Sequence, residues 1–170
     1  MNLKNILSFQ EFKQGLLFRS IVFAFMGIGW DLCMTFLQQS LSGKINHNGI
    51  CPVSVWMLLA YGTVPFFFYP LVSVTKHFRF HYVLRLVVLL AVFYAVELIF
   101  GLLMRSLNVL PWNYDWYLEP AWTIDGIITW HPAILGAWII FIMLVEWIDT
   151  VLRVSYPKIR ENLSAFWKDI

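Results

Sequence analysis

Four long apolar stretches govern what this chain can fold into. They lie near residues 16–38, 53–73, 81–105 and 132–153. Each has about 20 residues or more, the length that an α-helix needs to cross the hydrocarbon core of a bilayer. Inside a bilayer the backbone must satisfy its own hydrogen bonds, so such stretches form helices. The sequence therefore predicts an all-α, multi-pass membrane protein built as a four-transmembrane-helix bundle.

The composition agrees with this class and excludes others. The chain has 170 residues, of which 60% are hydrophobic and 13% are charged, and its mean hydropathy is +0.70. These values are typical of a membrane protein, and the length leaves room for one membrane domain, residues 1–170. The net charge of +2 argues against nucleic acid as a partner. No glycine-rich phosphate loop and no Cys/His metal spacing occurs, so we expect no ATPase activity, no cofactor and no metal.

Lysine and arginine are distributed unequally between the two sides of the predicted bundle. One side carries ten of them: Lys4, Lys13, Arg19, Lys76, Arg79, Arg85, Arg153, Lys158, Arg160 and Lys168. The other side carries only Lys44 and Arg105. Short cytoplasmic segments are enriched in these residues. We therefore expect cytoplasmic N- and C-termini, with the tail 154–170 in the cytoplasm, and a bacterial inner (plasma) membrane as the location.

Two acidic residues, Asp31 and Glu97, lie inside apolar stretches. A carboxylate at such depth is costly unless it is paired, protonated or hydrated, and it often marks function. Both residues lie just past the middle of helices that run in the same direction, so we expect them at one depth in the outer half of the membrane. Tyr61 and Trp56, on the helix that runs back, reach the same level. Arg105 lies two helical turns outward of Glu97.

The second apolar stretch contains two prolines, Pro65 and Pro70. Proline is tolerated in a membrane helix when neighbouring groups satisfy the carbonyl that loses its hydrogen bond. Pro65 removes the bond to the carbonyl of Tyr61. The sequence therefore predicts a kink beside Tyr61 and Gly62.

Three interpretations of the two acids stay open. As a structural element, they accept hydrogen bonds from Tyr61, Thr35, tryptophan or Arg105 and join helices. As a binding element, they form the floor of an outward-facing polar pocket for a lipid head group, a cation or a small solute. As a catalytic element, Asp31 or Glu97 acts as an acid or base. We favour a non-enzyme, because no nucleophile is plainly placed beside a base.

The binding interpretation assigns a role to each candidate residue. Arg105 would supply the counter-charge to the two carboxylates. The aromatic walls would come from Tyr61 and from Trp56, Trp112 and Tyr114. The bilayer itself would be the main partner, with a lipid or small solute in the pocket.

The predicted outer loop, residues 106–131, is long for a compact bundle and rich in tryptophan and tyrosine. One interpretation is an aromatic belt at the membrane interface. The other is a folded lid or re-entrant segment from Ala121 to Trp130 that covers the bundle.

Two further patterns concern the opposite side. Glu146, Asp149 and Arg153 share a helix face and, with Arg19 and Arg85, predict salt bridges between helix ends. In the C-terminal tail, apolar and basic residues alternate at helical spacing, which favours an amphipathic interfacial helix over a solvated tail. Those residues are Ile159, Leu163, Phe166 and Ile170, with Lys158, Arg160 and Lys168. The N-terminal residues 3–9 have a similar interfacial character.

Several short motifs occur in a fixed order along the chain. They are Gly-x-x-Trp-Asp (27–31), Ser-x-Trp (54–56), Tyr-Gly (61–62), Glu-x-x-x-Gly (97–101), Pro-Trp-Asn-Tyr (111–114) and Gly-x-Ile (126–128). This order resembles the CmpB-like ABC-transporter (type IV) membrane protein family and its small eukaryotic transmembrane relatives. Asp31 stands where that family usually has Glu, and Asn113 where it usually has Asp.

The resemblance implies a multi-pass, permease-like protein. The chain is small for one half of a complete ABC permease. The resemblance therefore implies self-association into a homo-oligomer or assembly into a larger membrane complex. A structural subunit of such a complex, without a ligand of its own, stays open as an alternative.

Overall fold

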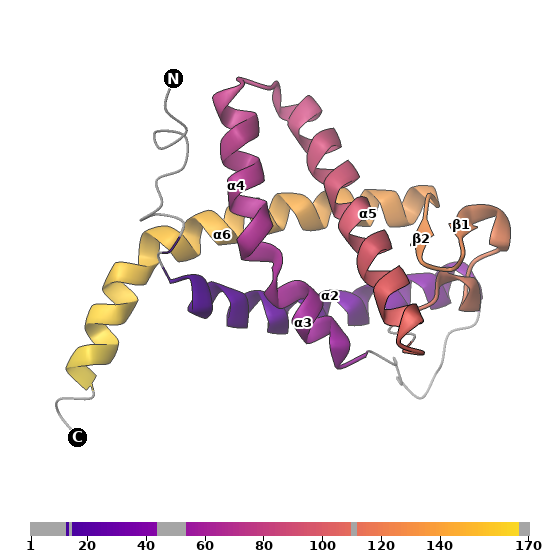
Figure 1. Cartoon of the computed structure of the whole chain (residues 1–170), viewed down its shortest axis with the longest axis horizontal. Coiled ribbons are helices and arrows are strands. Elements are labelled where there is room, and N and C mark those ends of the chain that lie inside the picture. Colours follow the sequence, from indigo (N-terminus) through magenta and orange to yellow (C-terminus); the bar gives the residue numbers. More distant parts are fainter. Residues whose placement is uncertain (1–12, 14, 44–53, 110–111, 167–170) are drawn as a thin grey trace.

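The computed structural model describes residues 13, 15–43, 54–109 and 112–166. The helices are α2 (Leu16–Leu41), α3 (Trp56–Gly62), α4 (Val64–His77), α5 (Tyr82–Ser106) and α6 (Pro132–Phe166) (Figure 1). Between α5 and α6 lie two short 3₁₀ turns, η2 (Tyr114–Trp116) and η3 (Pro120–Trp122), and two strands, β1 (Thr123–Ile124) and β2 (Ile128–Thr129).

Four helical segments are long and apolar enough to cross a membrane, with α3 and α4 counted together. Many of their large apolar side chains point outward, among them Phe25 on α2, Ile99 on α5 and Trp147 on α6. A water-soluble domain rarely exposes so much apolar surface, whereas lipid accepts it. The predicted all-α class and the four apolar helices are therefore confirmed.

The second spanning segment is divided, as its prolines predict. α3 ends at Gly62 and α4 begins at Val64, with Thr63 in a turn between them. Pro65 lies in the first turn of α4, where a missing N–H is tolerated. α4 continues to His77, beyond the predicted end at residue 73, and Pro70 lies inside it.

The helices are not all parallel. α2 and α6 run alongside each other, and the hairpin of α4 and α5 is inclined steeply across them (Figure 1). The buried core lies where these two pairs meet. It includes Phe23 of α2, Phe68 of α4, Leu89 of α5 and Phe141 of α6.

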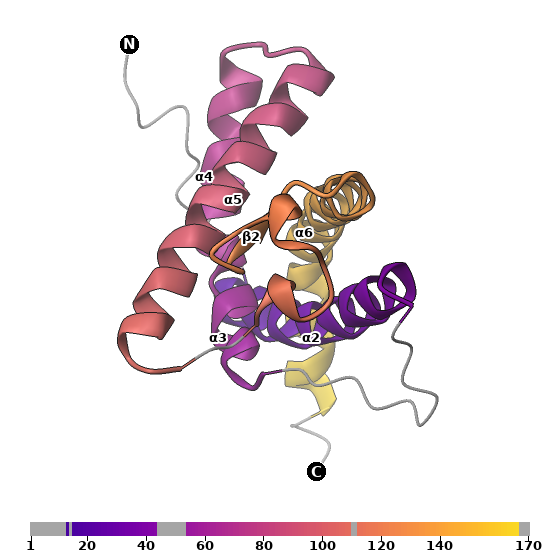
Figure 2. The same ribbon diagram turned by 90° about the vertical axis from the view of Figure 1, so that its right-hand side faces the viewer.

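The predicted outer loop is folded, and we call its residues 112–131 the loop cap. Its strands β1 and β2 pair antiparallel, with Ile124 opposite Ile128. Asp125 and Gly126 form the turn with φ values of 52° and 66°, as in the Asp-Gly hairpins that favour positive φ. The hairpin is a departure from the strictly all-α expectation. Figure 2 shows the loop cap lying between α5 on one side and α2 and α6 on the other, so the folded alternative applies.

The C-terminal segment corrects another expectation. α6 does not end near residue 153; it continues without interruption to Phe166, with Pro157 inside it. The ring of Tyr156 packs 5.9 Å from that of Phe18 and against Gly15, which holds this extension to the start of α2. The predicted C-terminal helix is therefore present as the bent continuation of α6 rather than as a separate element, and its place at a membrane interface stays a prediction. The predicted interfacial residues 3–9, Lys168 and Ile170 lie outside the described residues.

The predicted salt bridges are present, and we call their six residues the ionic cluster. They are Arg19, Lys76, Arg85, Glu146, Asp149 and Arg153. Arg19 donates to Asp149 through Nε at 2.8 Å and is fully buried. Arg153 donates to the second oxygen of Asp149 at 3.1 Å. Glu146 pairs with Arg85 at 2.9 Å and with Lys76 at 3.1 Å, so the cluster joins α2, α4, α5 and α6.

Candidate functional site

Asp31 is held by a tyrosine from the neighbouring helix. The hydroxyl of Tyr61 in α3 donates to Oδ1 of Asp31 in α2 at 2.6 Å. Gly27 lies one turn before Asp31 on the same face of α2. A Cβ at Gly27 would lie 1.9 Å from Cγ of Tyr61, so only glycine leaves room for the ring there. The motif Gly-x-x-x-Asp thus places an acid and the space for its partner on one helix face.

Glu97 is held in the same manner from the loop cap. The hydroxyl of Tyr114 donates to Oε1 of Glu97 at 2.8 Å, while Oε2 is buried and has no hydrogen-bond partner among the described residues. Gly101 lies one turn beyond Glu97, and a Cβ there would lie 2.4 Å from Cγ2 of Ile127. Gly101 therefore admits the loop cap to the surface of α5 beside Glu97.

Burial controls the protonation of Tyr114. Burial raises the pKa of this phenol well above its usual value of 10.0, and the charge of Glu97 beside it acts in the same direction. The phenol therefore stays protonated at neutral pH. An ionised carboxylate only accepts hydrogen bonds, so Tyr114 is the donor in its bond to an ionised Glu97.

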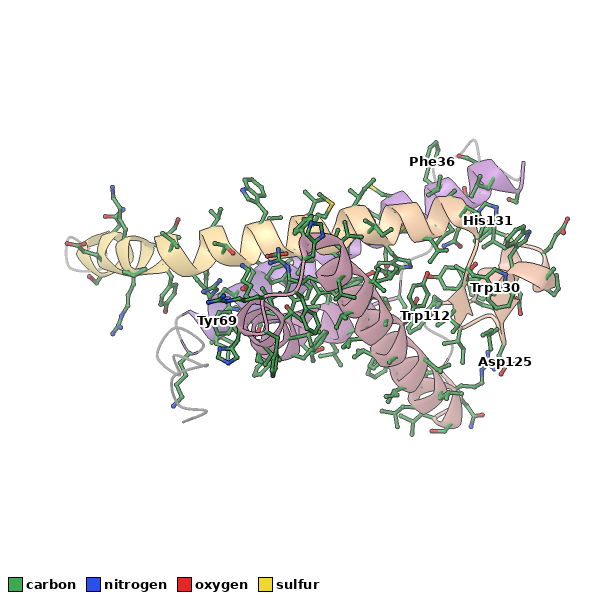
Figure 3. The ribbon with its side chains drawn as sticks, turned by 90° about the horizontal axis from the view of Figure 1, so that it is seen from above. Phe36, Tyr69, Trp112, Asp125, Trp130 and His131 are labelled. Carbon is green, nitrogen blue, oxygen red and sulfur yellow. The ribbon has the colours of Figure 1, made fainter. Side chains whose placement is uncertain are left out.

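Several further hydrogen bonds fix the loop cap on α5. Tyr94 of α5 donates to the carbonyl of Thr129 at 2.7 Å, and the indole of Trp112 donates to the carbonyl of Ile127 at 2.8 Å. Trp112 also stacks on Phe100 of α5, with ring centroids 6.1 Å apart. Figure 3 shows Trp112 between α5 and the rest of the loop cap. The cap is therefore anchored by both backbone and side-chain contacts.

Asp31 and Glu97 line one common cavity with a volume of about 110 Å³. Tyr61, Trp112 and Tyr114 line it as well. The structure thus brings together five of the seven residues that the sequence proposes for a site. The cavity is small beside the roughly 150 Å³ engineered cavity that holds benzene, but it has room for several water-sized groups.

Two predicted site residues do not line the cavity. Arg105 is exposed and donates to the backbone carbonyl of Asp125 in the hairpin turn, so it does not supply the expected counter-charge. The prediction failed because the sequence did not reveal the hairpin, whose Asp125 carbonyl accepts the hydrogen bond from the guanidinium of Arg105. Trp56 opens α3 with 42% of its surface exposed and lies outside the cavity wall.

The cavity also contains residues that the sequence did not single out. Trp138 of α6 and Phe93 of α5 line it, and their rings lie 4.7 Å apart between centroids. Trp138 is 3% exposed, and its Nε1 has no acceptor among the described residues. In the sequence Trp138 is one apolar residue among many in its helix, so no pattern distinguishes it.

The loop cap carries a second, more open hollow beside the end of α2. Asp115, Glu119, Trp122 and His131 line it. The rings of His131 and Trp122 meet edge to face, with 5.2 Å between their centroids. No group of three or more His, Cys, Asp or Glu side chains in the described ranges could hold a metal ion.

Carboxyl groups and phenols are the titratable groups that line the cavity. Two carboxyl groups and the phenols of Tyr61, Tyr114 and Tyr117 line it among further aromatic rings. Within the described part of the chain, no lysine, arginine, histidine or cysteine lines the cavity. No protein-family model, curated protein or solved structure matches this chain.

Proposed function

We propose that this protein is a permease-like membrane component that binds a small solute or a lipid head group in the cavity between α2, α3, α5 and the loop cap. The observation that carries the proposal is the pair of carboxyl groups, Asp31 and Glu97, which line one cavity with an unpartnered Glu97 oxygen. A buried polar atom without a partner costs about 1–3 kcal/mol. A ligand that supplies the missing partner recovers this free energy on binding.

The motif positions support the same site. Asp31, Tyr61, Glu97 and Tyr114 each end or begin one of the ordered motifs, and all four line the cavity. The motif glycines Gly27 and Gly101 make room for Tyr61 and for the loop cap. The resemblance to a transporter-named family therefore falls on the residues that build the cavity.

The test is to fill the cavity and compare what copurifies with the protein. Ala60 lines the cavity, whereas Ala91 of α5 is exposed on the outer surface. Ala60→Phe should remove a small molecule or lipid that mass spectrometry detects in purified wild-type protein. Ala91→Phe adds the same ring outside the cavity and should leave it bound. If both variants copurify the same species in the same amounts, the cavity does not bind a ligand.

We propose further that the loop cap faces outward and that both termini are cytoplasmic, in the plasma membrane. Of the basic residues in the described ranges, Arg105 alone lies at the loop-cap end. Single cysteines at Phe78 and Ala121, introduced after replacement of Cys33 and Cys51, test this orientation. An impermeant thiol reagent should label Ala121→Cys in intact cells and not Phe78→Cys. The opposite labelling pattern would reverse the topology.

We also propose that the protein works as a homo-oligomer or within a larger membrane complex. Its four spanning segments are few for a transport pathway of their own. The mass of the detergent-solubilised protein, measured by native mass spectrometry, tests self-association directly. A monomer without copurified protein would contradict this part of the proposal.

A further inference from the structure

The ligand class follows from the carboxyl oxygens that lack donors in the cavity, if the cavity is a binding site as proposed above. Nε1 of Trp138 is a buried lining donor without an acceptor among the described residues, and a ligand hydroxyl or phosphate oxygen could accept from it. Each carboxyl group receives one phenol: Tyr61 donates to Asp31 and Tyr114 donates to Glu97. A carboxylate has about four lone-pair positions, so one donor leaves most of them unused. Oε2 of Glu97 is buried and receives no donor from the described residues.

The two acids of the cavity also lack the basic partners that the acids of the ionic cluster have. In the ionic cluster, Asp149 is bonded to two arginines and Glu146 to Arg85 and Lys76. In the cavity, no basic side chain among the described residues contacts Asp31 or Glu97. A buried carboxylate without a positive partner is costly. A cationic ligand would compensate it, whereas an anion would be repelled.

The walls of the cavity suit a cation as well. Trp112, Trp138 and Phe93 line it together with three tyrosine rings. The face of an aromatic ring attracts a cation, and the attraction grows where water is excluded. The combination of carboxylates and aromatic faces is the usual protein environment for an ammonium group.

The volume of the cavity and its unused hydrogen-bond acceptors narrow the class of ligand further. A cavity of about 110 Å³ admits a group of a few heavy atoms. A primary ammonium has three N–H donors, which match the unused carboxylate positions. A quaternary ammonium is bulkier and has none. We propose that the cavity binds a small primary ammonium group, the chemistry of ethanolamine, either free or as a lipid head group.

The experiment compares ammonium chemistry on purified protein in phosphatidylcholine nanodiscs. Isothermal titration with ethanolamine should give saturable binding, with choline and neutral ethylene glycol at least roughly tenfold weaker, since a charge-assisted hydrogen bond contributes about 1.5–3 kcal/mol. For the lipid source, native mass spectrometry should show retention of phosphatidylethanolamine over phosphatidylcholine from mixed nanodiscs. A preference for ethanolamine in the titration identifies a free ammonium ligand, and a preference for phosphatidylethanolamine in the nanodiscs identifies a lipid head group. Either preference supports the proposal. Equal binding of ethanolamine and choline, together with equal lipid retention, overturns it.

Variants connect this selectivity to the cavity. Glu97→Gln keeps the shape and an oxygen for Tyr114 but removes the charge, and it should weaken ammonium binding roughly 10- to 100-fold. Glu119→Gln makes the same exchange on the exposed surface of the loop cap and should bind as wild type. Asp31→Asn repeats the test if Glu97→Gln does not fold. Undiminished ammonium binding in a folded Glu97→Gln or Asp31→Asn variant contradicts the proposal.

The outcomes separate this inference from the proposed function. If a neutral or anionic species copurifies with wild type and is lost in Ala60→Phe, the cavity binds a ligand but the ammonium inference fails. If no species differs between wild type and Ala60→Phe and no amine binds, both fail.

Discussion

The two acid-bearing regions of this protein treat buried carboxylates in opposite ways. In the ionic cluster, Asp149 is 3% exposed and each of its oxygens is bonded to an arginine. In the cavity, Glu97 receives one neutral phenol on Oε1 and nothing from the described residues on Oε2. The first carboxylate is satisfied within the protein, and the second is not.

The difference offers a criterion for separating a structural acid from a candidate ligand-binding acid in a chain of apolar helices. Carboxylate oxygens are buried in both regions, so burial alone does not discriminate. The donors do: guanidinium groups compensate charge, whereas phenols only orient a carboxylate. Removing a partner should therefore damage folding in the ionic cluster and ligand binding in the cavity.

The largest expected effect is on the ionic cluster. Asp149→Asn removes the carboxylate that faces the buried guanidinium of Arg19 and should lower the free energy of unfolding by about 3–5 kcal/mol. The thermal midpoint of the detergent-solubilised protein, followed by size-exclusion chromatography after heating, measures the loss. Glu97→Gln removes a carboxylate that has no basic partner among the described residues and should change the midpoint far less. Equal loss in both variants would remove the distinction between the two regions.

A second prediction concerns the packing beneath Asp31. Gly27→Ala places a Cβ 1.9 Å from Cγ of Tyr61 and should cost about 1–3 kcal/mol by overpacking while displacing the phenol. Gly29→Ala is the matched control, because nothing lies within 4 Å of a Cβ there. The control should be neutral or slightly stabilising, since alanine favours the helix. Similar melting of the two variants would show that Tyr61 does not need this space.

A third prediction separates anchoring of the loop cap from orientation of the carboxylate. Tyr114→Phe removes the donor to Glu97 and should lower the free energy of unfolding by about 1–2 kcal/mol. It should also weaken ligand binding. Tyr94→Phe removes the donor to the carbonyl of Thr129 and should cost about 1 kcal/mol, with binding retained. Melting and ethanolamine titration of both variants give the comparison. Loss of binding in Tyr94→Phe alone would contradict the assignment.

The smallest expected effect lies at the edge of the ionic cluster. Lys76 pairs with Glu146, but its side chain is 52% exposed. Lys76→Ala should therefore lower the free energy of unfolding by no more than about 0.2–1 kcal/mol, and by less at high salt. Arg85→Ala, at 12% side-chain exposure on the same carboxylate, should cost more. The reverse order of the two melting midpoints would contradict the view that burial decides the strength of these pairs.

Much of the fold follows from apolar length and charge. The four long apolar segments and the break near Pro65 follow from local composition. The ion pairs of Glu146 with Arg85 and of Asp149 with Arg19 follow from helical spacing. The continuation of α6 does not, because the contact of Tyr156 with Phe18 joins distant parts of the chain. Local patterns carry no information about such contacts.

Five of the seven candidate residues and the bond from Tyr61 to Asp31 were predictable, whereas the roles of Arg105 and of the loop-cap anchors were not. Asp31 and Glu97 stand out because acids are rare in apolar helices, and their common depth follows from helix direction. The role of Arg105 depended on the hairpin at Asp125 and Gly126, whose strands are two residues long. Such short strands have no recognisable periodicity, so the loop cap and its anchors appear only in three dimensions.

The length of α6 connects the two acid-bearing regions through one helix. At about 1.5 Å per residue, its 35 residues make about 50 Å of helix, more than a hydrocarbon core of about 30 Å requires. Figure 1 shows its C-terminal part, which contains Pro157, bent away from the rest of the helix. Trp138 of α6 lines the cavity, and Asp149, about three turns further along, holds Arg19 of α2. The position of this cavity wall is therefore tied to the ionic cluster through continuous helix.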